Sequence, residues 1–141
     1  MASNGFVLAA TVILLFALGY FFLASPAFLF VKLDIPPVTQ LLRGMFNVQF
    51  QMLTVAGSIG TLAFVLAGRP AFAIGTGLIA FLAVWGRPRF LGLMDAQLQA
   101  RDSGDARAVP RLRRLHWGGM FANAILLAAV VCSLPFVSTS S

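Results

Sequence analysis

The sequence contains few charged side chains and almost none that are acidic. Only 10% of its 141 residues are charged, and the four acidic residues are all aspartate. A soluble domain of this length usually carries about a quarter charged residues. With 60% hydrophobic residues and a mean hydropathy of +0.92, the chain cannot cover a water-facing surface. We therefore expect lipid to cover most of it.

Residues that usually bind metals or haem are also scarce. The chain has one histidine, His116, one cysteine, Cys132, and no glutamate. Paired carboxylates, Walker loops, GxGxxG motifs and cysteine clusters are absent, so no enzyme class is indicated. A lone cysteine excludes an intramolecular disulfide. We expect no cofactor and no metal; a haem or metal ion held between the histidines of two copies is the alternative left open.

What the chain does contain is four long apolar stretches. They cover residues 6–31, 44–66, 70–86 and 115–134, approximately. At 1.5 Å per residue, about 20 helical residues match a hydrocarbon core of about 30 Å. The predicted fold class is an all-α integral membrane four-helix bundle, forming a single transmembrane domain over residues 1–141.

Proline and glycine positions refine this prediction. Pro26 lies in the last third of the first stretch and predicts unwinding near Ser25. Pro135 is expected to end the last helix for the same reason. Gly57 and Gly60 in the second stretch predict close packing against a neighbouring helix, because small residues let helix backbones approach each other.

The basic residues indicate how the helices are oriented. Nine of the ten lie in the first and third gaps between the apolar stretches, and the second gap holds only Arg69. Cytoplasmic loops carry an excess of basic residues. This predicts a bacterial inner (plasma) membrane protein with both termini outside the cytoplasm. Contact of the basic gaps with anionic lipid headgroups accounts for the net charge of +6 without nucleic acid.

Polar residues inside the apolar stretches are the candidate site. Arg43, Asn47 and Gln51 recur at roughly helical spacing along the second stretch, and His116 and Asn123 share a face of the fourth. Ionisable and amide groups are expensive in lipid, so we expect them to face the bundle. They would either form a cavity for a polar ligand or hold the helices together by hydrogen bonds.

Three segments resemble a group of small four-span membrane proteins of largely unassigned function. The group includes bacterial proteins, a eukaryotic transmembrane protein linked to platinum-drug tolerance and, more distantly, anthrone-oxygenase-like proteins. The resemblance lies in the segments Ala24-Ser25-Pro26-Ala27-Phe28 to Leu41-Leu42-Arg43-Gly44-Met45-Phe46, Arg87-Pro88-Arg89, and Arg113-Arg114-Leu115-His116 with the later Asn123. Trp85-Gly86 stands where those proteins often have asparagine and proline. The resemblance implies the four-span topology and marks His116, Asn123 and Arg43 as candidate site residues.

Two functions fit these observations. A short chain with polar stripes and little mass outside the membrane suits an accessory, structural or assembly subunit, with other membrane proteins as its partners. The alternative is a membrane enzyme or binder of a hydrophobic small molecule, quinone-like or polyketide-like, that enters from the lipid. A transporter or channel ranks last, because no predicted span carries an acidic residue for coupling.

Overall fold

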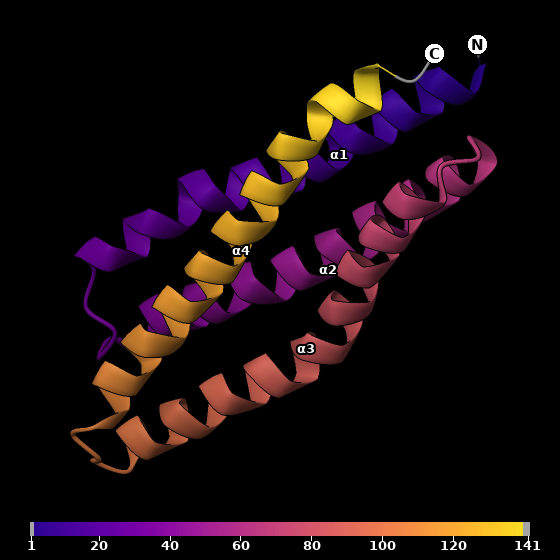
Figure 1. Ribbon diagram of the computed structural model, residues 1–141. Coiled ribbons are helices and arrows are strands. Elements are labelled where there is room, and N and C mark those ends of the chain that lie inside the picture. Colours follow the sequence, from indigo (N-terminus) through magenta and orange to yellow (C-terminus); the bar gives the residue numbers. More distant parts are fainter. Residues whose placement is uncertain (1, 140–141) are drawn as a thin grey trace.

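The computed structural model describes residues 2–139 and confirms an all-α bundle of four helices (Figure 1). All four helices are long and apolar enough to cross a membrane. In chain order the elements are α1 (Ala2–Ala24), the short 3₁₀ helix η1 (Ser25–Phe30), α2 (Pro36–Leu66), α3 (Pro70–Asp102) and α4 (Ala108–Ser138).

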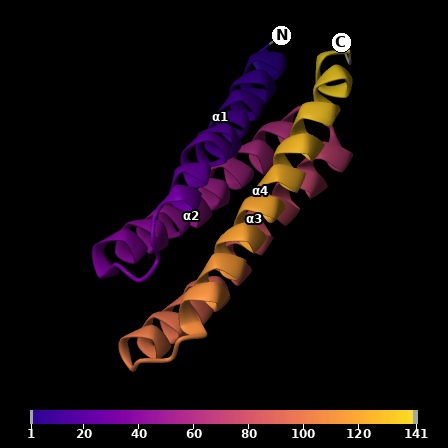
Figure 2. The same cartoon turned by 90° about the vertical axis from the view of Figure 1, so that its left-hand side faces the viewer.

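The connections alternate between the two ends of the bundle. The first and last described residues lie near the α2–α3 turn, and the α1–α2 and α3–α4 connections lie together at the opposite end (Figures 1 and 2). Arg101 Nη1 donates to the backbone oxygen of Leu33 at 3.1 Å, which ties these two connections together. At the other end, Arg69 Nη1 donates to the oxygen of Val137 at 2.9 Å. The end with residues 31–35 and 103–107 is called the basic end below.

Helix boundaries follow the prolines only in part. The break predicted at Pro26 is confirmed, since α1 ends at Ala24 and η1 begins at Ser25. The end predicted at Pro135 is wrong, because α4 continues to Ser138. Pro135 removes only the bond from its own nitrogen to the carbonyl of Val131, and the helix ends three residues later.

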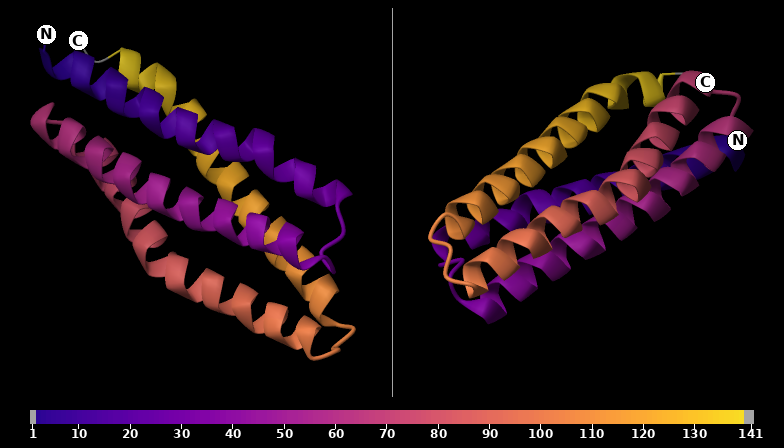
Figure 3. Two further views of the ribbon diagram at one scale, coloured as in Figure 1. Left: turned by 180° about the vertical axis from the view of Figure 1, so that it is seen from behind. Right: turned by 90° about the horizontal axis from the view of Figure 1, so that it is seen from below.

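Helix α3 extends far beyond the apolar stretch predicted to end at residue 86. It continues through Pro88 to Asp102 and bends partway along its length (Figure 3). Proline has no N–H group and its ring crowds the carbonyl of the preceding turn, which bends a helix. Beyond residue 86 α3 still contacts α2, where Arg43 pairs with Asp95 at 2.6 Å, and it ends at the α3–α4 connection.

Three of the four helices are much longer than their predicted apolar stretches. Helices α2, α3 and α4 contain 31, 33 and 31 residues. At 1.5 Å per residue each is about 46–50 Å long, whereas a hydrocarbon core measures about 30 Å. Each of these helices is therefore longer than a single crossing of the hydrocarbon core requires.

The close approach of α2 and α3 depends on glycine. A Cβ atom added to Gly57 would lie 2.9 Å from both the backbone nitrogen of Ala80 and the backbone oxygen of Thr76. At Gly60 it would lie 3.0 Å from Thr76 Cγ2. These glycines therefore pack against α3 as their small size predicted.

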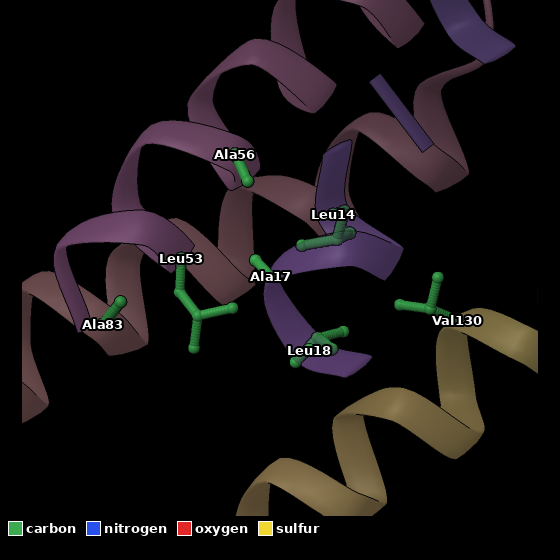
Figure 4. Packing of buried hydrophobic residues seen from close by; sticks show 7 residues of the cluster. All are labelled: Leu14, Ala17, Leu18, Leu53, Ala56, Ala83 and Val130. Atoms are coloured by element: carbon green, nitrogen blue, oxygen red, sulfur yellow. The ribbon is translucent and has the colours of Figure 1, made fainter. Parts of the chain in front are cut away.

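All four helices meet in the middle of the bundle. Figure 4 shows this core cluster, which contains Leu14, Ala17 and Leu18 of α1, Leu53 and Ala56 of α2, Ala83 of α3 and Val130 of α4. The cluster fixes the bundle on the side away from the basic end.

Candidate functional site

A cavity of about 570 Å³ lies between α2, α3 and α4, in the half of the bundle next to the basic end. It extends along α4 from Arg111 to Leu126. That distance is about 22 Å at 1.5 Å per residue. The cavity therefore reaches from the basic end into the middle of the bundle.

Aromatic rings form one wall of the cavity. The centroids of Phe46 and Phe90 are 4.7 Å apart, those of Phe21 and Phe46 are 5.1 Å apart, and those of Phe50 and Phe90 are 5.7 Å apart. All four rings line the cavity. Gly119 of α4 lies so close to the Phe46 ring that a Cβ atom there would collide with it. The wall is rigid and apolar, which suits a hydrophobic occupant.

A hydrogen-bonded chain of amides crosses the bundle at the deep end of the cavity. Asn123 Nδ2 donates to the backbone oxygen of Leu18 at 3.1 Å, and Asn123 Oδ1 accepts from Gln49 Nε2 at 3.0 Å. A backbone carbonyl can only accept, so it fixes which end of the Asn123 amide faces α1. The oxygen of Asn123 then faces Gln49, which must present its NH₂ group. The carbonyl oxygen of Gln49 then takes no part in this chain of hydrogen bonds.

Two amide oxygens at the cavity consequently have no hydrogen-bond partner within residues 2–139. They are Gln49 Oε1 and Gln97 Oε1, and both residues line the cavity. Gln49 is only 6% exposed, so water at the surface does not reach it. A buried polar atom without a partner costs about 1–3 kcal/mol. A molecule in the cavity that donates a hydrogen bond would remove this cost.

Two arginines line the cavity at the basic end. Arg111 Nη1 lies 3.5 Å from Asp105 Oδ2, and both side chains are about 40–45% exposed. Such an exposed ion pair contributes at most about 1 kcal/mol. Within the described chain Arg114 forms no hydrogen bond or ion pair. The shallow end of the cavity is therefore positively charged.

His116 lies outside the cavity, between α4 and the end of α1. Its Nε2 is 2.9 Å from Ser25 Oγ and 3.1 Å from the backbone oxygen of Ser25, and both residues are fully buried. Arg113 reinforces this contact by donating to the backbone oxygens of Phe28 and Val31 in and after η1. His116 thus faces the bundle and has a partner, and the pair anchors η1 to α4.

The other predicted residues are distributed between α2 and α3. Arg43 forms a two-pronged ion pair with Asp95, with nitrogen–oxygen distances of 2.6 and 2.9 Å. Asn47 Oδ1 accepts from Arg87 Nε at 2.8 Å. Gln51 is exposed on the outer surface of α2. The single ligand site predicted from these residues together with His116 and Asn123 is therefore not formed.

Of the five predicted site residues, only Asn123 lines the cavity. Sequence reasoning missed Gln49, Gln97, Arg111 and Arg114. The position of Gln49 carried a detectable signal, since it follows Phe46 by three residues and precedes Leu53 by four, on the buried face of α2. Within residues 2–139, no three His, Cys, Asp or Glu side chains form a group that could hold a metal ion.

No protein-family model, curated protein or solved structure matches this chain. The candidate function therefore follows from the cavity and the polar groups that line it.

Proposed function

We propose that this protein is a membrane-embedded binding protein for a hydrophobic small molecule, held in the cavity between α2, α3 and α4. The observation that carries the proposal is the unpartnered oxygen of Gln49, which is nine-tenths buried beside an apolar space. Ligand sites are typically apolar cavities of about 300–1,000 Å³ with a few polar groups that orient the ligand. The size and lining of this cavity agree with that description.

The ligand would enter sideways from the bilayer. Leu93 on α3 and Ala122 on α4 line the cavity and are both exposed, Leu93 by 56%. They border the opening between the two helices. A molecule dissolved in lipid can reach this opening without crossing water, and the aromatic wall would accept a ring system of the quinone-like or polyketide-like kind as well as a chain.

Binding is favoured over catalysis because no reactive pair lies in the cavity. The one serine–histidine contact, between Ser25 and His116, is fully buried and does not line it. The backbone oxygen of Ser25 accepts a hydrogen bond from His116 Nε2, which is a structural arrangement. The polar groups that do line the cavity are amides and arginines, which bind and orient but are weak acids and bases.

The experiment compares two substitutions by tryptophan on α4. Ala122→Trp fills the cavity opening, whereas Ala128→Trp places the same bulk at an exposed position that does not line this cavity. Each protein is extracted from its native membrane in mild detergent and weighed by native mass spectrometry. Wild type and A128W should carry an additional bound mass that A122W lacks. Equal occupancy in A122W and A128W would contradict the proposal.

We place the basic end at the cytoplasmic face of a bacterial inner membrane. Support comes from the arrangement of the connections: residues 31–35 and 103–107 share one end, and the basic residues cluster there. The positive-inside tendency then puts both termini outside the cytoplasm. We also propose that this chain is related to the small four-span membrane proteins. The basis is the set of segments described above, including Arg113 to His116 and Asn123.

An accessory-subunit role is the second candidate, and Gln51 favours it. This residue is exposed midway along α2, between the exposed Val48 and Val55, and makes no hydrogen bond within residues 2–139. An amide facing hydrocarbon is costly, and polar residues in lipid usually mark a helix–helix contact. A partner membrane protein would cover this surface of α2.

Site-directed cross-linking tests the subunit role. In a Cys132→Ser background, Gln51→Cys should form a cross-link to another chain when membranes are treated with a bifunctional maleimide. Val12→Cys, exposed on α1, provides the matched control. If neither position cross-links, or both do so equally, Gln51 does not mark a subunit contact.

A further inference from the structure

We infer that the ligand is an acidic amphiphile with a second hydrogen-bond donor partway along its hydrophobic body. Its phosphate or carboxylate group would pair with Arg114 and Arg111, and its donor, a hydroxyl or N–H group, would bind the oxygen of Gln49. This inference rests on the proposed function and narrows its ligand class.

The arginines at the shallow end of the cavity favour a ligand with a negatively charged group. Arg111 and Arg114 are one turn apart on α4 and both line the cavity. The only acidic group paired with either is Asp105, at 3.5 Å from Arg111, among the residues that the structure describes. Arginine binds carboxylate and phosphate in a matching two-pronged geometry. An acid group here would satisfy Arg114, which lacks a protein partner.

The deep end of the cavity favours a ligand with a hydrogen-bond donor. Gln49 Nε2 is committed to Asn123, whose own orientation is fixed by the backbone oxygen of Leu18. This leaves the oxygen of Gln49 as its group without a partner at the cavity. A ligand carbonyl or ether would leave this oxygen unsatisfied, whereas a hydroxyl or N–H group would bond to it.

The distance between the two ends sets the spacing of the ligand groups. Asn123, at the level of Gln49, follows Arg114 by nine residues on α4. Nine helical residues correspond to about 14 Å. Eleven carbon–carbon bonds of about 1.5 Å in an extended zigzag chain cover a similar distance. An acid with a hydroxyl group near its twelfth carbon therefore matches both polar ends.

The first arm of the experiment tests the acid group. Binding of oleate and oleyl alcohol to the delipidated full chain in a neutral detergent is measured by native mass spectrometry. Oleate should bind about tenfold more tightly, given the attraction of arginine for anionic groups at the membrane surface. Arg114→Gln should abolish this preference, and Arg107→Gln, which removes the same charge from the exposed α3–α4 connection, should preserve it.

Lysophosphatidate and inorganic phosphate identify the source of the anion. Lysophosphatidate should compete with oleate, because both carry an acid group and an apolar chain. Inorganic phosphate alone should not compete, because it gains nothing from the apolar wall. If phosphate competes at the same concentration, the ligand is a free anion and not an amphiphile.

The second arm tests the deep donor. The ratio of oleate to 12-hydroxyoleate dissociation constants is compared in wild type and Gln49→Leu. We expect 12-hydroxyoleate to bind about tenfold more tightly to wild type. The ratio should fall to about one in Q49L. Because the ratio is taken within each protein, a general loss of affinity in the variant cancels. Equal binding of both acids to wild type would overturn the deep donor.

The outcomes separate this inference from the proposed function. If oleate, oleyl alcohol and 12-hydroxyoleate all bind equally and A122W excludes them, the cavity binds hydrophobic molecules but the ligand class is wrong. If none binds, and A122W matches A128W in native occupancy, the proposed function itself fails.

Discussion

His116 Nε2 lies 2.9 Å from the hydroxyl oxygen and 3.1 Å from the backbone oxygen of Ser25, at the residue where α1 ends and η1 begins. A helix end leaves carbonyl groups without intrahelical partners, and in lipid they need other donors. His116 supplies one such donor from α4. The contact therefore stabilises the break that Pro26 introduces and holds the start of α4 against α1.

Replacing His116 should destabilise the bundle without emptying the cavity. His116→Leu removes the donor to Ser25 and should lower the free energy of unfolding by about 1–3 kcal/mol. Ser25→Ala removes the hydroxyl group but keeps the carbonyl contact, so its effect should be smaller. Unfolding in mixed micelles measures both, with Trp117→Leu at the neighbouring exposed position as control. If S25A lowers the free energy of unfolding as much as H116L does, the contact does not depend on the Ser25 carbonyl.

Adding one methyl group to Gly57 should weaken the α2–α3 contact. The new Cβ would lie 2.9 Å from the backbone of α3, so Gly57→Ala should destabilise the protein by about 1–3 kcal/mol. Gly44 is on the same helix with nothing within 4 Å of its Cβ position. Gly44→Ala should therefore be neutral or stabilise by up to about 1 kcal/mol. Thermal unfolding in one detergent compares the pair, and equal melting temperatures would count against the packing.

Gln49 and Asn123 should be energetically coupled. A double-mutant cycle with Gln49→Leu and Asn123→Leu should give a coupling free energy of about 1 kcal/mol, as for other hydrogen bonds between membrane helices. The cycle needs unfolding free energies of four proteins under one condition. Additive effects would mean that the two amides do not bond, and Gln49 Oε1 would then not be fixed as the unpartnered group at the cavity.

Orientation in the membrane can be read from labelling of single cysteines. In a Cys132→Ser background, Ser138→Cys lies at the end of α4 and Ser103→Cys in the α3–α4 connection, both exposed. A membrane-impermeant maleimide should label S138C in intact spheroplasts, which lack the outer membrane. It should label S103C only after the cells are lysed. The reverse pattern would place the basic end outside the cytoplasm.

Much of the fold was predictable because it depends on composition along the chain. Four apolar stretches, the break at Pro26 and the glycine contact at Gly57 and Gly60 are local properties, and the structure confirms them. The predicted span ends at residue 86, whereas α3 continues to Asp102. Proline bends this helix without ending it.

The site was harder to predict because it depends on which face of α2 is buried. Gln49 and Gln51 are two residues apart, about 200° around a helix, so only one can face inward. The spacing of Phe46, Gln49 and Leu53 marks the buried face, whereas the site prediction rests on the stripe of Arg43, Asn47 and Gln51. Arg43 and Asn47 bond to the part of α3 beyond residue 86, which the predicted span omitted. The cavity itself depends on how α2, α3 and α4 are placed relative to one another, which no spacing along a single helix encodes.

Photolabelling in liposomes tests most directly whether the cavity holds a hydrophobic molecule. An aliphatic diazirine acid is equilibrated with the full chain and activated by light, and the labelled residues are mapped by peptide mass spectrometry. The account predicts labelling concentrated in residues 90–97 and 115–126, abolished by excess unlabelled acid and by Ala122→Trp but not by Ala128→Trp. Labelling spread evenly over the outer faces of all four helices, and insensitive to A122W, would contradict it.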